Sequence, residues 1–66
     1  MKNSLKVERA KKDMTQQDLA DQIGVSRQTI NSIEAGKYVP STVLALKIAR
    51  CFDVAVERIF ELEENE

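Results

Sequence analysis

The sequence predicts an all-α fold of five short helices in a single domain over residues 1–66. A chain of 66 residues has room for one small core, and only two glycines and one proline interrupt it. Apolar residues recur at helical spacing along most of the chain, and no segment reads as a strand. We therefore expect short helices joined by tight turns.

A domain this small needs disulfides, a metal, a partner subunit or efficient helix packing. Cys51 is the only cysteine, which excludes an intrachain disulfide, and the lack of histidine excludes a Cys/His zinc site. We interpret Cys51 as a small buried apolar residue rather than a redox switch. Helix packing and self-association remain, and we expect no metal and no cofactor.

The composition also argues against an enzyme. Without histidine the chain lacks the commonest general base, and its length leaves little room for a water-excluding pocket, so we expect no catalytic residues. No run approaches the roughly 18 apolar residues of a membrane span, and the N-terminus lacks the apolar stretch of a signal peptide. Together with the lone thiol, these features favour a cytoplasmic protein with no membrane partner.

The charges are unevenly distributed. Residues 1–50 hold nine Lys/Arg and five Asp/Glu, a net of +4, whereas residues 51–66 hold one Arg and six acids, a net of −5. A basic body with an acidic end suits a surface that faces nucleic acid, although an ordinary solvated surface would look the same.

The first two helices are indicated by their composition and caps. Residues Leu5 to Lys12 favour a helix and contain no breaker. Thr15 can cap the next helix, and Asp18 three residues later completes a capping-box-like pattern. The inward stripe of that second helix consists of Leu19, Ala20 and Ile23.

Gly24 can supply the positive φ that turns the chain out of the second helix, and Ser26 is a good N-cap for a third helix from Arg27 to Ala35. Ile30 and Ile33 of this helix face inward. Its other face is wholly polar and carries Arg27, Gln28, Asn31 and Ser32.

The remaining segment predicts two more helices. Gly36 ends the third helix, and Ser41 caps a fourth. The apolar stripe of the fourth helix consists of Leu44, Ala45, Ile48, Ala49 and Phe52. Residues Val56 to Leu62 predict a short fifth helix, and the acidic tail over residues 63–66 should fray.

Helices two and three, over about residues 16–35, are joined by a turn of about three residues that contains Gly24. This is the helix-turn-helix arrangement, in which the second of the two helices can lie in the major groove of DNA.

The segment from Thr15 to Lys37, TQQDLADQIGVSRQTINSIEAGK, resembles the lambda-repressor-like (Cro/repressor-type, xenobiotic-response-element) helix-turn-helix regulators of bacteria and phages. The resemblance is specific because this motif needs three different features at fixed spacing. These are a small residue where the two helices approach closely, a glycine in the turn, and apolar residues that hold the second helix against the core. The residues that meet them are Ala20, Gly24, Val25, Ile30 and Ile33. Pro40-Ser41 and the stripe after it resemble the family's fourth helix, so the resemblance covers nearly the whole chain.

The resemblance implies that the third helix reads DNA bases through Arg27, Gln28 and Ser32, with Asn31 as a further candidate. Arg can pair with guanine and Gln with adenine in the major groove. Without the resemblance, the same face would read as an ordinary solvated helix surface. The resemblance further implies phosphate contacts from Gln16, Thr29, Lys37 and Tyr38, and from backbone N–H groups near Ser41 and Thr42.

Arg9 and Glu34 match positions that form a partly buried ion pair in some members of this family, so we expect the pair here. Arg9 has a further nitrogen that could reach a phosphate. Two positions depart from the family pattern. Ala55 stands where a Ser or Thr caps the fifth helix, unless Asp53 substitutes for it. Asp13 stands at a turn where Gly is common, and Asp tolerates the left-handed backbone there at a small cost.

Reading one half-site gives modest affinity, so the resemblance implies a homodimer on a pseudo-palindromic operator. The interface is expected within residues 51–62, at Cys51, Val54, Val56, Ile59, Phe60 and Leu62. Alternatively Val56, Ile59 and Phe60 complete the core of the monomer, leaving only Leu62 exposed.

We expect a transcriptional repressor. One alternative is an antitoxin that binds both DNA and a toxin protein, and another is a protein-interaction module on the same fold.

Overall fold

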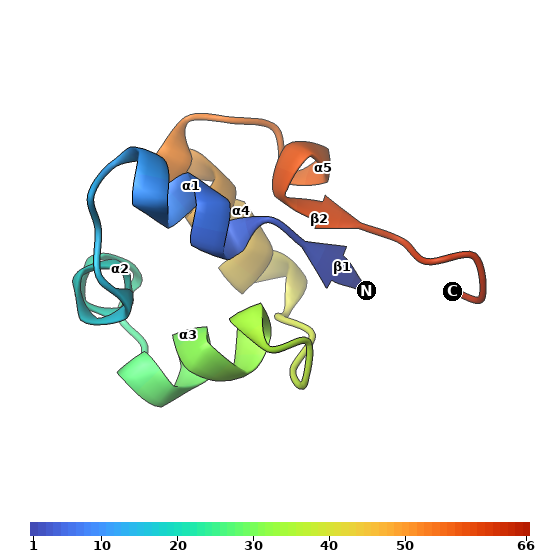
Figure 1. Cartoon of the computed structure of the whole chain (residues 1–66), viewed down its shortest axis with the longest axis horizontal. Coiled ribbons are helices and arrows are strands. Elements are labelled where there is room, and N and C mark those ends of the chain that lie inside the picture. The colour runs from blue at the N-terminus through green and yellow to red at the C-terminus, as the bar shows by residue number, and fades with distance from the viewer.

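The computed structural model describes residues 1–66 as five helices and two short strands (Figure 1). The helices are α1 (Leu5–Lys11), α2 (Gln16–Ile23), α3 (Arg27–Glu34), α4 (Thr42–Phe52) and α5 (Val56–Ile59). The strands are β1 (Lys2–Asn3) and β2 (Phe60–Glu61). All five predicted helices are present, and α2, α3 and α4 begin directly after the predicted caps Thr15, Ser26 and Ser41.

The helices enclose one apolar core to which every helix contributes. Its buried members are Leu5, Leu19, Ala20, Ile23, Ile30, Ile33, Leu44, Ile48, Ala49, Phe52, Ile59 and Phe60. In the view of Figure 1, α3 lies along the lower edge of the body, with α1 above it. One side of α3 therefore packs on the core, and the other side is left to solvent.

Short side chains begin α2, α3 and α4. In each case the N-cap hydroxyl accepts a hydrogen bond from the backbone N–H three residues later. The pairs are Thr15 with Asp18 at 2.9 Å, Ser26 with Thr29 at 3.1 Å, and Ser41 with Leu44 at 3.1 Å. The Asp18 carboxylate returns a bond to the Thr15 N–H at 3.0 Å, which confirms the capping box.

Four turn residues lie in the left-handed backbone region, among them Gly36 after α3 with φ +75°. Gly24 has φ +76°, and its N–H donates to the carbonyl of Ala20 at 2.9 Å, which ends α2. Asp13 and Asp53 have φ of 53° and 55° at the ends of α1 and α4. The expectation that Asp13 adopts the conformation usual for glycine is therefore confirmed.

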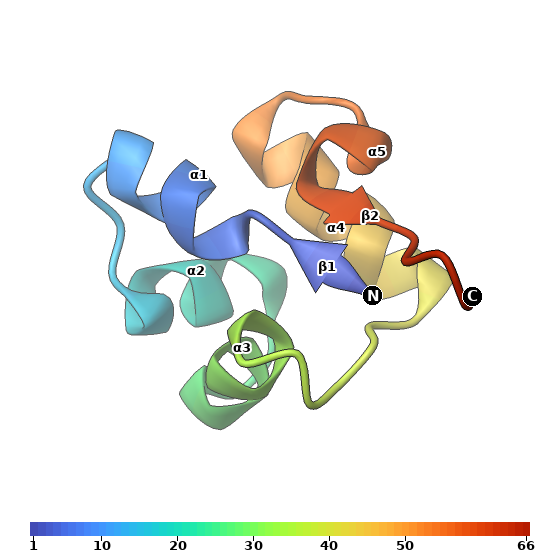
Figure 2. The same cartoon turned by 45° about the vertical axis from the view of Figure 1, so that its right-hand side comes forward.

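The expectation of no strand was wrong. Lys2 pairs with Glu61 and Asn3 with Phe60 in an antiparallel ladder, which Figure 2 shows beside α5. The N–H of Ser4 extends the contact to the carbonyl of Ile59 at 2.9 Å. Strands of two residues are too short to carry an alternating pattern, so they cannot be recognised from the sequence.

The fifth helix ends earlier than the predicted Leu62. Ala55 stands at its N-cap and supplies no side-chain hydrogen bond, and Asp53 does not replace it because it serves as the C-cap of α4. Phe60 is already extended and belongs to β2. With no side-chain cap at its start and an extended residue directly after Ile59, α5 is a single turn.

The acidic tail, expected to fray, forms a turn beside the N-terminus. The N–H of Glu66 donates to the carbonyl of Glu63, and the carboxylates of both residues lie within 3.0 Å and 3.7 Å of the amino group of Met1. These contacts raise the pKa of the Met1 amino group, chiefly through the hydrogen bond to Glu66.

None of the helices is both long and apolar enough to cross a membrane.

Candidate nucleic-acid interface

The eight residues of α3 divide into a buried and a polar side. Ile30 and Ile33 are almost completely buried in the core. The predicted base-reading residues lie on the remaining surface: Arg27, Gln28 and Asn31 are exposed, and Ser32 is half-buried. A helix of this length presents about 12 Å of continuous polar surface, since each residue adds about 1.5 Å.

An open hollow of about 320 Å³ lies on this surface, between α3 and the loop that follows it. It is lined by Ser26, Gln28, Thr29, Ser32, Lys37 and Tyr38. The hollow therefore brings two of the predicted base-reading side chains together with three of the predicted phosphate contacts. Its walls offer hydroxyl, amide and ammonium donors, which suit an anion rich in oxygen atoms.

Two hydroxyls in the predicted phosphate set already have partners. The Thr29 hydroxyl lies 2.9 Å from that of Ser26, and the Ser41 hydroxyl caps α4. Ser41 and Thr42 are exposed at the start of α4, where backbone N–H groups have no partner within the helix. Contacts from this end of α4 would come from the backbone, as the sequence analysis expected.

The predicted ion pair between Arg9 and Glu34 is present and nearly buried. The Arg9 Nε and Nη2 atoms donate to Glu34 Oε2 and Oε1 at 2.5 Å and 3.0 Å, and only 13% and 7% of the two side chains are exposed. The hydrogen bond to Glu34 raises the pKa of Arg9 above its ordinary value. The pair ties α1 to the last residue of α3.

Each guanidinium nitrogen of Arg9 has a partner within the protein, and Nη1 and Nη2 each keep a second N–H, so a reach to a phosphate stays a prediction. Its Nη1 atom donates to the carbonyl oxygen of Met14 at 2.7 Å. All three guanidinium nitrogens therefore bond within the protein, and the side chain joins α1, the turn before α2 and α3.

Gln16 is also placed differently from the prediction. Its Nε2 atom donates to Glu34 Oε1 at 3.1 Å and to Asn31 Oδ1 at 3.3 Å. These bonds use both hydrogens of the amide, so the side chain has no N–H left for a phosphate. A phosphate at this end of α2 would meet the backbone N–H groups instead.

Asn3 is a structural residue that the sequence analysis missed. Its Nδ2 atom donates to the carbonyl of Ile33 at 2.9 Å, and its Oδ1 atom accepts from the N–H of Leu5 at 3.2 Å. Asn3 thus fixes the last turn of α3 against β1 and α1. An asparagine near an N-terminus is common in any sequence, so no local signal could have identified it.

The residues predicted for a dimer interface separate into three groups. Ile59 and Phe60 are buried in the core of the monomer, which corrects their assignment as contacts between subunits. Cys51, Val54 and Val56 are partly buried against that core. Leu62 is 70% exposed, the most exposed large apolar residue of the chain.

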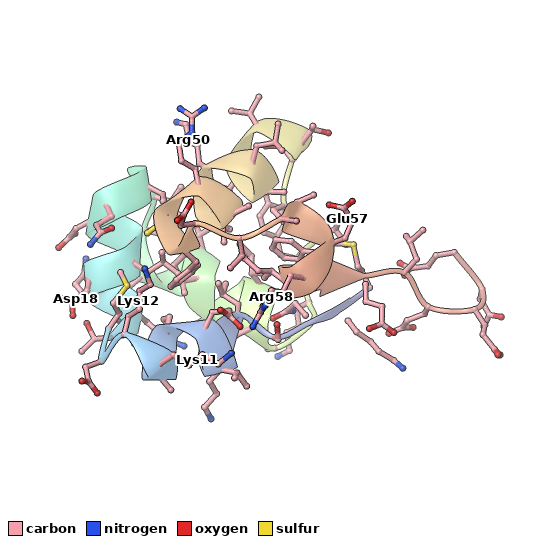
Figure 3. All side chains as sticks on the ribbon, turned by 90° about the horizontal axis from the view of Figure 1, so that it is seen from above. Lys11, Lys12, Asp18, Arg50, Glu57 and Arg58 are labelled. Carbon is pink, nitrogen blue, oxygen red and sulfur yellow. The ribbon has the colours of Figure 1, made fainter.

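Two basic side chains outside α3 lie on different faces of the domain. Figure 3 shows Lys11 of α1 and Arg50 of α4 pointing away from opposite sides of the body. Within α3 itself Arg27 is the single cation, so the polar surface of this helix is distinguished by its hydrogen-bond donors rather than by a large excess of positive charge.

Comparison with known proteins places this geometry in a family. The family model for the helix-turn-helix (HTH_3) matches residues 5–59. An uncharacterised HTH-type transcriptional regulator of Methanocaldococcus jannaschii is 58% identical over 66 residues, covering 100% of both chains. Another from Bacillus subtilis is 48% identical over 65 residues, covering 98% of both.

A similar solved structure is the restriction-modification controller protein C.AhdI of Aeromonas hydrophila. It superposes with a TM-score of 0.78 and 30% sequence identity over 85% of each chain. The chain therefore belongs to the Cro/C1-type helix-turn-helix family of DNA-binding transcriptional regulators.

Proposed function

We propose that this protein is a sequence-specific transcriptional repressor that binds a pseudo-palindromic operator as a homodimer. One observation supports it above the others: α3 exposes Arg27, Gln28 and Asn31 on the side opposite its buried isoleucines. A helix held by the core on one side and free on the other can enter the major groove without rearrangement.

Two residues carry the proposed base readout. Arg27 is exposed at the first position of α3, where its guanidinium can pair with guanine O6 and N7. Gln28 lines the hollow and can pair with adenine N6 and N7. Lys37 and Tyr38, at the far wall of the same hollow, would contact the phosphates that flank those bases.

The experiment is selection of duplexes from a random DNA library at near-physiological salt, with the wild type and with Arg27→Ala and Gln28→Ala. We expect a two-fold consensus with half-site centres about 34 Å apart, one helical turn. Each substitution should relax the preference at its own base pair by about 1 to 3 kcal/mol. Arg50→Ala, which alters an exposed cation of α4, is the matched control and should leave the consensus unchanged.

Failure of the wild type to enrich any sequence would overturn the proposal and favour a protein-interaction module. Co-purification of a toxin-like protein partner would instead favour the antitoxin reading. Enrichment that is indifferent to both α3 substitutions would remove base reading from Arg27 and Gln28.

The proposed dimer uses the C-terminal part of the chain. Leu62 is exposed there, and Val54 and Val56 retain part of their surface. We expect Leu62→Glu to convert a dimer into a monomer in sedimentation equilibrium, because it would place a charge in an apolar contact. Leu46→Glu, at an exposed leucine of α4, is the control. Dissociation by Leu46→Glu alone would move the interface to α4.

A further inference from the structure

Asn31 is connected to the buried ion pair through Gln16. Gln16 is the first residue of α2, and its single amide nitrogen lies 3.1 Å from Glu34 Oε1 and 3.3 Å from Asn31 Oδ1. Glu34 is in turn held by two nitrogens of Arg9. A chain of hydrogen bonds thus leads from Arg9 in α1 to an exposed side chain of α3.

The direction of each bond in this chain is forced. The oxygen and nitrogen ends of an amide have the same shape, so their partners decide which end faces which group. The Glu34 carboxylate is paired with Arg9 and can only accept, so Gln16 must turn its NH₂ group toward it. The second hydrogen of that NH₂ group then points to Asn31, which must accept it through its side-chain oxygen, Oδ1.

Asn31 is therefore oriented by residues that are far from it in sequence. With its Oδ1 atom turned toward α2, its Nδ2 atom is the end available to a ligand of the exposed α3 surface. The reverse orientation would place two NH₂ groups against each other and leave Gln16 with one unmade bond.

We propose that Gln16 is a specificity-determining positioning residue, which makes Asn31 a hydrogen-bond donor to a base acceptor in the major groove. The acceptors there are O6 and N7 of guanine, O4 of thymine and N7 of adenine, but the N6 group beside adenine N7 is a donor and would face Nδ2 without an acceptor. Bidentate pairing of an asparagine with adenine needs Oδ1 and Nδ2 side by side, facing the same base. The bond to Gln16 turns Oδ1 toward α2 and away from the base, so Asn31 cannot make this bidentate pair and favours guanine or thymine over adenine.

This inference rests on the proposed function, but its first part can be measured without DNA. In ¹⁵N-labelled protein, both Nε2 protons of Gln16 should be slow to exchange with solvent, whereas the Nδ2 protons of Asn31 should exchange as in a free amide. Slow exchange at Asn31 and rapid exchange at Gln16 would show the opposite polarity and overturn the inference.

The second measurement is the selected DNA consensus of Gln16→Met, which keeps the length of the side chain and removes the amide. At the base pair whose preference is lost in Asn31→Ala, we expect the preference to move from guanine or thymine to adenine by about fivefold or more. Added to Asn31→Ala, Gln16→Met should have no further effect at that base pair.

Gln17→Met is the matched control. It makes the same substitution at the next residue, where the side-chain amide donates to Asp21 at 2.8 Å and takes no part in the chain to Asn31. Its consensus should equal that of the wild type. A merely structural role for Gln16 would lower thermal stability and overall affinity while leaving the preference at that base pair unchanged, and this outcome would overturn the inference.

The two proposals fail in different ways. No enriched sequence with the wild type would overturn the proposed function itself. A clear wild-type consensus that Gln16→Met leaves intact would overturn only the role of Gln16. Should Gln16→Met not fold, Gln16→Ala provides a second route, since it removes the same amide, leaves the pair of Arg9 and Glu34 in place and should relax the same base pair.

Discussion

Asn3 and Ile33 are joined by a hydrogen bond from the Asn3 amide to the Ile33 carbonyl, across 30 positions of the chain. The same carbonyl accepts the N–H of Gly36, which turns the chain out of α3. The last turn of the candidate recognition helix is thus held from two directions, once by its own loop and once by the N-terminal strand.

Replacing Asn3 by Ala should lower the free energy of unfolding by about 1 to 3 kcal/mol, because two hydrogen bonds are lost and half-buried partners are left unpaired. Urea denaturation followed by circular dichroism measures the change. Asn65→Ala, at an exposed residue of the tail, is the control and should stay within about 0.5 kcal/mol of the wild type. Equal values for the two variants would contradict the role given to Asn3.

Removing one member of the buried ion pair should be more costly. Arg9→Met leaves the carboxylate of Glu34 without its main partner, and about 3 to 5 kcal/mol of stability should be lost. Lys11→Met removes a pair with Glu8 in which the lysine is 54% exposed, and it should cost less than about 1 kcal/mol. The double variant Arg9→Met/Glu34→Met should recover part of the loss in the same urea experiment.

The elements that the sequence predicted are those defined by neighbouring residues. The capping box of Thr15 and Asp18 lies within four positions, and the stripe formed by Ile30 and Ile33 lies within one turn of helix. Such patterns can be read without knowing the fold. They located the helices, the glycine turn after α2 and the exposed side of α3.

The parts that were missed depend on contacts between distant segments. The strand pair joins residues near the two ends of the chain, and the amide of Gln16 meets Asn31 and Glu34 only after α2 and α3 have packed. The family resemblance predicts a phosphate contact for Gln16 from its position in the motif alone. Its orientation follows from an acceptor 18 residues away, which no local pattern encodes.

Acid should weaken the start of α2. The pKa of Asp18 is lowered because its carboxylate accepts the backbone N–H of Thr15 and, second, because it interacts with the Thr15 side chain. The folded state thus binds this proton less tightly than the unfolded chain does, so the stabilisation is complete above the ordinary pKa of about 4 and is lost as the pH falls through the lower folded value.

We therefore expect the free energy of unfolding of the wild type to fall more steeply between about pH 5 and pH 2 than that of Asp18→Asn. Urea titrations at a series of pH values give both curves. Asp21→Asn, on the same helix but outside the capping box, should follow the wild type. Parallel curves for the wild type and Asp18→Asn would contradict the argument.

A missing cap can be supplied at α5. Ala55 already has the extended backbone of an N-cap residue, with φ −66° and ψ 145°, but no side-chain acceptor. Ala55→Ser should therefore raise the free energy of unfolding by about 1 kcal/mol. The control is Ala10→Ser, at an exposed position inside α1, where serine should be neutral or slightly unfavourable. A gain at both positions would point to a cause other than capping.

Lys37 is the one cation that lines the hollow on α3, and its role follows from the proposed function. A lysine that contacts a phosphate releases a counterion on binding, so Lys37→Ala should reduce the slope of log K against log salt by about 1. It should leave the selected consensus unchanged, because phosphates carry no sequence information. Lys12→Ala, at a lysine exposed at the end of α1 (Figure 3), should preserve the slope. A changed consensus in Lys37→Ala would instead make Lys37 a base-reading residue, and an unchanged slope would place the phosphates away from the hollow.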